Sequence, residues 1–218
     1  MPERKFKIYL LIDRDTAKKF SRDIYRIAES AGKAKVDFIQ FRFGNTDLTK
    51  VLEESLKLKK IIGKFKTTRF IINNRTDIAK AVSADGVHLG NTDLPPETAR
   101  ELLGKNAIIG KTVHSMKEMS NALKESVDYL SFGPVFKTSL KPNLKPWGIG
   151  KIKKAVDFFL SSEKGKDMDY FVIGGITLNN IGSILKKGIT NIALSTEALR
   201  SSRPIKVLEE INKACLSV

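Results

Sequence analysis

Two pairs of residues in this sequence have the types and the spacing to bind anions. Gln40 and Arg42 stand two positions apart in the apolar segment 36–42, so in a strand both side chains point to the same face. An arginine that points into a protein needs an anionic partner. Gly174 and Gly175 end another apolar segment, just before a helical pattern begins. Glycine lets backbone N–H groups approach a phosphate closely, and the start of a helix adds a favourable dipole.

Other polar residues also stand where apolar segments end. Ser195 and Thr196 follow the segment "NIAL" and can add hydroxyl or backbone donors. His114 follows "GKTV", and an imidazole can move a proton near neutral pH. The alternative for His114 is a ring held by hydrogen bonds beneath a site. His88 stands inside an apolar segment, and we expect it to be structural.

Strand-like segments alternate with helical patterns along the whole chain. We count eight βα units without a break in composition, which predicts an α/β fold: a single (β/α)8 TIM barrel domain over residues 1–218. A doubly wound open sheet is the alternative. The count of eight and the polar or glycine residues at the strand ends favour the barrel. The expected strands are 6–12, 36–42, 69–73, 84–90, 107–110, 128–133, 170–175 and 191–195, and the expected helices are 16–31, 47–63, 76–82, 95–103, 116–125, 149–162, 178–187 and 197–215.

The predicted barrel indicates that the C-terminal strand ends form a functional site. The loops that follow the strands of such a barrel build its active site, and the loops after strands seven and eight frequently hold a phosphate. This placement favours phosphate binding at Gly174, Gly175, Ser195 and Thr196 over a tight turn without a ligand. The longest irregular segment, 133–148, follows strand six, and its prolines and glycines exclude a helix. A loop of this length is more often functional than not.

The composition narrows the classes of partner. The chain carries 39 Lys and Arg against 24 Asp and Glu, a formal charge of +15. The lysines are spread over most expected helices without a basic stripe that also carries aromatic residues, so we expect no nucleic acid as the main partner. A solvated lysine-rich surface and attraction of anionic substrates both fit the charge. No apolar segment approaches the ~18 residues of a membrane helix, so we expect no membrane partner and a cytoplasmic protein. The single cysteine, Cys215, excludes an internal disulfide.

Residues 6–200 resemble the superfamily of thiamine-phosphate synthases and thiazole tautomerases. The resemblance is carried, in order, by "FIQFR", "FIINNRTDIAKAVSADGVHLGNTDLP", "IIGKTVHS", "YLSFGPVFKTSLK" and "VIGGIT". It implies a (β/α)8 barrel in thiamine biosynthesis. The synthase joins a hydroxymethylpyrimidine diphosphate to a thiazole phosphate and releases pyrophosphate, whereas the tautomerase aromatises the thiazole phosphate. The implied partners are therefore small phosphates and diphosphates, and a homodimer is a candidate assembly.

The synthase resemblance also implies roles for single residues. Arg42 and Lys141 would stabilise the departing diphosphate, and Asp93 would bind Mg²⁺, with Asn74 at the position of a second metal ligand. In the tautomerase, His114 would be the catalytic residue. The remaining implied contacts are Gln40 with the pyrimidine and diphosphate, Asn73 with the pyrimidine, Thr112 with the diphosphate, Thr138 in the substrate loop, and Gly175 with Ser195 at the thiazole phosphate.

Three departures from the synthase pattern fall on its diphosphate and metal half. Gly44 stands where the family has a lysine, Asn74 where it has a carboxylate, and Leu140 where it has a threonine. These departures predict weakened or altered synthase activity, and they keep the tautomerase as the alternative, although Asp93 favours the synthase. We hypothesise that Lys137 and Lys145 replace the cation lost at Gly44. Trp147 is a candidate for an apolar rim or lid.

Overall fold

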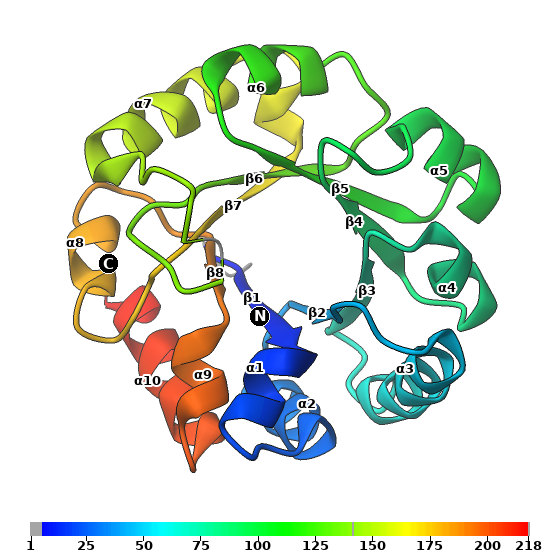
Figure 1. Ribbon diagram of the computed structural model, residues 1–218. Helices are drawn as coiled ribbons and strands as arrows, with labels where there is room; N and C mark the ends of the chain where they lie inside the picture. Colours follow the sequence, from blue (N-terminus) through cyan, green and yellow to red (C-terminus); the bar gives the residue numbers. More distant parts are fainter. Residues whose placement is uncertain (1–5, 141, 218) are drawn as a thin grey trace.

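A closed barrel of parallel strands lies at the centre of the computed structural model, which describes residues 6–140 and 142–217 (Figure 1). Each strand pairs with the next in chain order, and β8 closes the barrel by pairing with β1. This confirms the (β/α)8 prediction and excludes the open sheet. The strands are β1 (Ile8–Asp13), β2 (Phe38–Arg42), β3 (Arg69–Asn73), β4 (Gly86–Leu89), β5 (Ile108–Val113), β6 (Tyr129–Phe132), β7 (Asp169–Ile173) and β8 (Ile192–Leu194).

Helices surround the barrel on its outside (Figure 1). All eight expected helical segments contain helix, but two of them are divided. Segment 16–31 breaks at Ser21, which has a φ of 53°, and a new helix starts at the N-cap Asp23. Segment 197–215 breaks before Pro204, which begins its last helix. The helices are α1 (Arg14–Lys19), α2 (Ile24–Lys33), α3 (Leu48–Ile62), α4 (Thr76–Ala81), α5 (Pro96–Leu103), α6 (Met116–Ala122), α7 (Gly148–Ser161), the short 3-10 helix η1 (Gly165–Asp167), α8 (Ile181–Leu185), α9 (Thr196–Arg200) and α10 (Pro204–Leu216).

An aromatic layer fills the part of the barrel interior near the N-terminal ends of the strands. It consists of Tyr9, Phe38, Tyr129 and Phe171, whose ring centroids lie 4.9 to 5.8 Å apart. Gly110 makes room for it, because a Cβ there would lie 1.9 Å from the Tyr129 ring. This layer is separate from the larger core between the strands and the helices. Among the described residues this layer closes the N-terminal side of the interior, and the C-terminal side is left for a ligand.

The irregular segment 133–147 connects β6 to α7 and crosses to the end of β7. The backbone N–H of Val135 donates to the carbonyl of Ile173 at 2.9 Å, and the N–H of Phe136 donates to the carbonyl of Gly174 at 3.0 Å. The loop is thus bound to the strand end next to it. Its described residues, 133–140 and 142–147, form no helix, which agrees with the prediction from its prolines and glycines.

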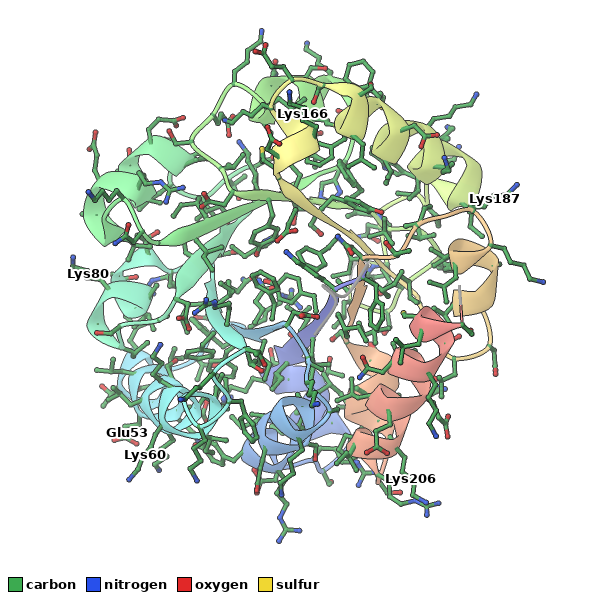
Figure 2. All side chains as sticks on the ribbon, turned by 180° about the vertical axis from the view of Figure 1, so that it is seen from behind. Glu53, Lys60, Lys80, Lys166, Lys187 and Lys206 are labelled. Atoms are coloured by element: carbon green, nitrogen blue, oxygen red, sulfur yellow. The ribbon has the colours of Figure 1, made fainter. Side chains whose placement is uncertain are left out.

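Lysine side chains point outward all around the barrel. Figure 2 labels Lys60 on α3, Lys80 on α4, Lys166 on η1, Lys187 after α8 and Lys206 on α10, and all five are exposed. The positive charge is therefore spread over the circumference. Within the described residues, no helix has the length and apolar character needed to cross a membrane.

Candidate active site

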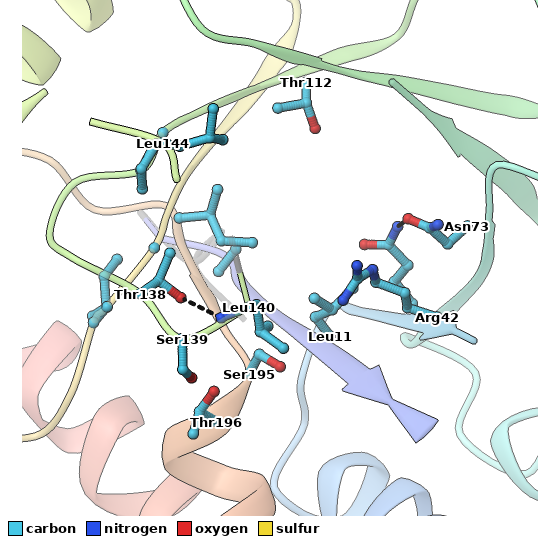
Figure 3. Close-up of a pocket in the computed structure, with 18 of the residues that line it drawn as sticks. Leu11, Arg42, Asn73, Thr112, Thr138, Ser139, Leu140, Leu144, Ser195 and Thr196 are labelled. Carbon is cyan, nitrogen blue, oxygen red and sulfur yellow. Dashed lines mark hydrogen bonds between the residues drawn. The ribbon is translucent and has the colours of Figure 1, made fainter. Parts of the chain in front are cut away.

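A cavity of about 470 Å³ opens at the C-terminal ends of the strands. Every predicted site residue that the structure describes lines it, and Lys141 lies outside the described residues. Figure 3 shows Arg42 and Asn73 on one side of this pocket and Thr138, Ser139, Ser195 and Thr196 on another. The predicted residues that line it are Gln40, Arg42, Asn73, Asn74, Asp93, Thr112, His114, Thr138, Gly174, Gly175, Ser195 and Thr196.

Gln40 and Asn73 form a polar pair beneath one side of the pocket. Both belong to the inward face of neighbouring strands, and the Nε2 amide of Gln40 donates to Oδ1 of Asn73 at 2.7 Å. Gln40 is 4% exposed, so this bond holds its amide in place. Oε1 of Gln40 and Nδ2 of Asn73 make no further hydrogen bond with the described residues. An acceptor and a donor are therefore available to a heterocyclic ligand.

Arg42 is held by a carboxylate that our sequence analysis did not assign to the site. Its Nη1 donates to Oδ2 of Asp13 at 2.8 Å. Asp13 is 3% exposed, and its Oδ1 caps α1 by accepting from the N–H of Thr16 at 2.8 Å. The guanidinium keeps its other donors for an anion in the pocket. The position of Asp13 at the end of a strand was the signal that could have identified it.

Thr112 and His88 bring a buried hydrogen bond to the floor of the pocket. Nε2 of His88 lies 2.6 Å from Oγ1 of Thr112, and Nδ1 lies 2.8 Å from the hydroxyl of Tyr129. His88 is 7% exposed and also belongs to the lining of the pocket. Thr112 therefore presents a hydroxyl whose orientation depends on a histidine.

His114 stands at the end of β5 with a defined arrangement of its ring. Nδ1 lies 2.8 Å from the carbonyl oxygen of Gly133, and because a carbonyl only accepts, Nδ1 must carry the hydrogen. A neutral His114 ring then has a basic Nε2. The ring is held by a hydrogen bond, as one alternative expected, and it also lines the pocket, as the other expected.

Glu118 connects the loops after β4 and β5. Its Oε2 accepts from Nδ2 of Asn91 at 2.8 Å and from the backbone N–H of His114 at 2.9 Å. Partial burial raises the pKa of Glu118, but these hydrogen bonds outweigh it, and the pKa lies below its usual value. The ionised carboxylate thus joins the loop of Asp93 to that of His114.

Asp93 and Asn74 are the oxygen donors that a magnesium ion would use. Both line the pocket, and Oδ2 of Asp93 accepts from the N–H of Gly90 at 2.6 Å. Asn74 has a φ of 62°, which asparagine tolerates. The described residues hold no group of three or more His, Cys, Asp or Glu side chains that could bind a metal. One carboxylate and one amide fit Mg²⁺, which takes few protein ligands and completes its shell with phosphates and water.

Gly174 and Gly175 have a physical role in addition to the phosphate binding expected from the sequence. Their φ angles are 108° and 66°, and a Cβ on either would collide with the β6 loop, the segment that follows β6. At Gly175 the added carbon would lie 2.4 Å from the carbonyl oxygen of Lys137. The glycines therefore let the long loop pack against the end of β7.

Unpaired donors gather beside these glycines. The backbone N–H groups of Gly175, Ser195 and Thr196 donate to no described residue in the structure. The Oγ of Ser195 is buried and also has no partner within residues 6–140 and 142–217. Four donors at the ends of β7 and β8 are therefore available to a phosphate.

The two lysines proposed to replace the cation at Gly44 have different positions. Lys137 lines the pocket, whereas Lys145 lines a second cavity with Trp147 and Met116. The part of the hypothesis that concerns Lys145 stays a prediction. Arg200 on α9 also lines the pocket, and our sequence analysis did not identify it. Arg200 stands one helical turn after Thr196, and this spacing could have indicated that it reaches the pocket.

The fold and the site define a (β/α)8 barrel protein with one pocket at the C-terminal strand ends, and this pocket has unpaired donors on two sides. The chain belongs to the thiamine monophosphate synthase family, whose model matches residues 8–198. It is 35% identical to thiamine-phosphate synthase 1 of Aquifex aeolicus, over 95% of this chain and 92% of that protein. It is also 35% identical to the thiamine-phosphate synthase of Clostridium acetobutylicum, over 91% and 89% of the two chains.

A solved structure supports the same relationship. The thiamine phosphate pyrophosphorylase of Pyrococcus furiosus superposes with a TM-score of 0.83 at 29% sequence identity. The match covers 98% of this chain and 97% of the other. The fold and the family expected from the sequence are therefore both confirmed.

Proposed function

We propose that the protein is a thiamine-phosphate synthase, which joins a hydroxymethylpyrimidine diphosphate to a thiazole phosphate and releases pyrophosphate. The observation that carries this proposal is the shared pocket, with a diphosphate-sized set of donors around Arg42 and a second set around Ser195. Two anion sites in one pocket suit a reaction that joins two phosphorylated molecules. Family membership supports the same reaction.

The residues suggest how the pyrimidine diphosphate binds. Oε1 of Gln40 and Nδ2 of Asn73 offer an acceptor and a donor to the edge of an aminopyrimidine. Arg42 and Thr112 would contact the diphosphate, with Lys137 from the loop as a further cation. Asp93 and Asn74 would hold Mg²⁺, which supplies positive charge to the leaving diphosphate when it is bound.

The other half of the pocket would position the nucleophile. The donors of Gly175, Ser195 and Thr196 would hold the thiazole phosphate, so that the thiazole nitrogen faces the pyrimidine methylene carbon. The carbon–oxygen bond to the diphosphate breaks, the electron pair leaves with pyrophosphate, and the nitrogen forms the new bond to carbon. Positioning and cationic stabilisation suffice for this step, so no nucleophilic side chain of the protein is needed.

One assay with two measurements tests the proposal. Purified protein is mixed with both substrates and Mg²⁺, and pyrophosphate release is followed while absorbance reports thiazole isomerisation. We expect pyrophosphate release in the wild type and its loss in Asp93→Ala. Isomerisation that needs no metal and disappears in His114→Ala would instead support the tautomerase. The cytoplasmic location, a homodimer and the absence of a nucleic-acid partner stay predictions from the sequence.

A further inference from the structure

A chain of hydrogen bonds runs through the barrel interior from the aromatic layer to the pocket. The hydroxyl oxygens of Tyr9 and Tyr129 lie 2.8 Å apart, and the Tyr129 oxygen lies 2.8 Å from Nδ1 of His88. Nε2 of His88 then lies 2.6 Å from Oγ1 of Thr112. Tyr9, Tyr129 and His88 are 3%, 1% and 7% exposed. The chain therefore begins in the closed part of the barrel and ends at the ligand cavity.

The hydrogens of this chain can be arranged in two directions around a neutral His88 ring, which has one donor and one acceptor nitrogen. In the first, Tyr9 donates to Tyr129, which donates to Nδ1 of His88. The Nε2–H of His88 then donates to Thr112, which keeps its own hydrogen for a ligand. In the second, every hydrogen points the other way. The hydroxyl hydrogen of Tyr9 is then left over in the aromatic layer.

Burial decides between the two directions. Burial raises the pKa of both tyrosines far above its usual value, so both hydroxyls keep their hydrogens. The hydroxyl of Tyr9 forms no hydrogen bond with a described residue other than Tyr129. In the second direction the buried O–H of Tyr9 would therefore lack an acceptor, which is unfavourable. In the first, the surplus hydrogen belongs to Thr112, which lines the open pocket.

We propose that this buried chain fixes Thr112 as a hydrogen-bond donor toward an anionic oxygen in the pocket. The inference rests on the proposed function, under which that oxygen belongs to the diphosphate. His88 and Tyr129 are positioning residues, because they act through Thr112. A threonine hydroxyl has one hydrogen to donate, and in the first direction the Thr112 oxygen accepts from His88, so that hydrogen stays available to a ligand. A donor held in advance stabilises the charge that develops on a leaving diphosphate.

Nitrogen-15 NMR of the histidine rings tests the direction without any turnover. The chain has two histidines, so protein made without a histidine tag gives two ring patterns, which His88→Gln assigns. We expect the hydrogen of His88 on Nε2 and that of His114 on Nδ1, so the two rings carry opposite tautomers. A His88 ring with its hydrogen on Nδ1 would overturn the proposal.

Two matched variants test the effect on binding, with Mg²⁺-pyrophosphate as the probe in isothermal titration calorimetry. Tyr129→Phe and Tyr9→Phe each remove one hydroxyl from the aromatic layer. Only Tyr129→Phe removes the hydrogen bond that Nδ1 of His88 accepts. We expect the Kd to rise about 10-fold in Tyr129→Phe and at most about 2-fold in Tyr9→Phe. An equal rise in both variants would contradict the proposal.

A double variant shows whether the effect passes through Thr112. Thr112→Val removes the hydroxyl, so we expect weak binding. Thr112→Ser keeps a hydroxyl, so we expect near-normal binding. Adding Tyr129→Phe to Thr112→Val should cause no further loss. A further loss would overturn the proposal. Failure of the synthase reaction is distinguishable, because the tautomer and the pyrophosphate affinity are measured without the second substrate.

Discussion

Some residues of the pocket form hydrogen bonds within the protein and also keep donors for the expected ligand. Arg42 shows this most clearly, because one nitrogen of its guanidinium donates to Asp13 and the others remain for an anion. Asp13 in turn caps α1, so the direction of the arginine depends on the start of a helix. A planar group with several fixed donors is well suited to make both contacts at once.

We therefore expect Arg42→Lys to bind Mg²⁺-pyrophosphate at least about 10-fold more weakly, because an ammonium lacks the planar fork of donors that can contact Asp13 on one side and a diphosphate on the other. Isothermal titration calorimetry measures this affinity. Arg75→Lys is the matched control, since Arg75 pairs with Asp77 and does not line the pocket. Equal effects of the two substitutions would show that total charge, not the shape of Arg42, governs binding.

Among the elements, the β6 loop and the end of β7 depend on each other. The loop donates two backbone hydrogen bonds to residues 173 and 174, and the glycines of that strand end leave the space that the loop occupies. The same strand end supplies a backbone donor for the expected thiazole phosphate. Loop packing and phosphate binding should therefore fail together.

Gly175→Ala tests this dependence. Its φ of 66° disfavours a side chain, and the new Cβ would lie 2.4 Å from a loop carbonyl. We therefore expect the free energy of unfolding, measured in urea, to fall by about 2–4 kcal/mol. We also expect the KM for thiazole phosphate to rise. Gly188→Ala is the control, because its φ is 72° but no atom lies within 4 Å of the added carbon. It should lose only about 1 kcal/mol and keep its KM. Similar losses in both would mean that the loop contact contributes nothing.

The whole molecule carries a positive field without a single basic face. The formal charge is +15, and lysines on separate helices surround the barrel (Figure 2). Both expected substrates are anions, so this field should raise the rate at which they reach the pocket. The effect acts on encounter and not on the chemical step.

We expect kcat/KM for the diphosphate substrate to fall at least about 3-fold between roughly 50 and 300 mM KCl, while kcat stays constant. Steady-state assays at fixed Mg²⁺ measure both constants. Lys80→Glu and Lys187→Glu, on opposite sides of the barrel in Figure 2, should each lower kcat/KM slightly and to a similar degree. A large effect at only one of them would indicate a local path for the substrate.

Much of the site could be predicted from the sequence because a parallel barrel brings all the C-terminal strand ends together. The alternation of inward and outward residues then places Gln40 and Arg42 at the pocket without any knowledge of distances, whereas Thr112 was expected there from the family resemblance. The periodicity located all eight helical segments, but it did not show where two of them divide, because signals such as the break at Ser21 lie within an otherwise helical pattern.

What the sequence determined by itself was therefore the order of the elements and the face on which each side chain lies, since both follow from local periodicity. Only the tertiary structure decided which groups touch. Residues 9 and 129 are 120 positions apart, yet their hydroxyls share a hydrogen bond. The same holds for Asp13, which contacts Arg42, and for Lys145, which lines a cavity other than the pocket. Such contacts depend on the closure and register of the barrel and on the course of its loops, which no local pattern contains.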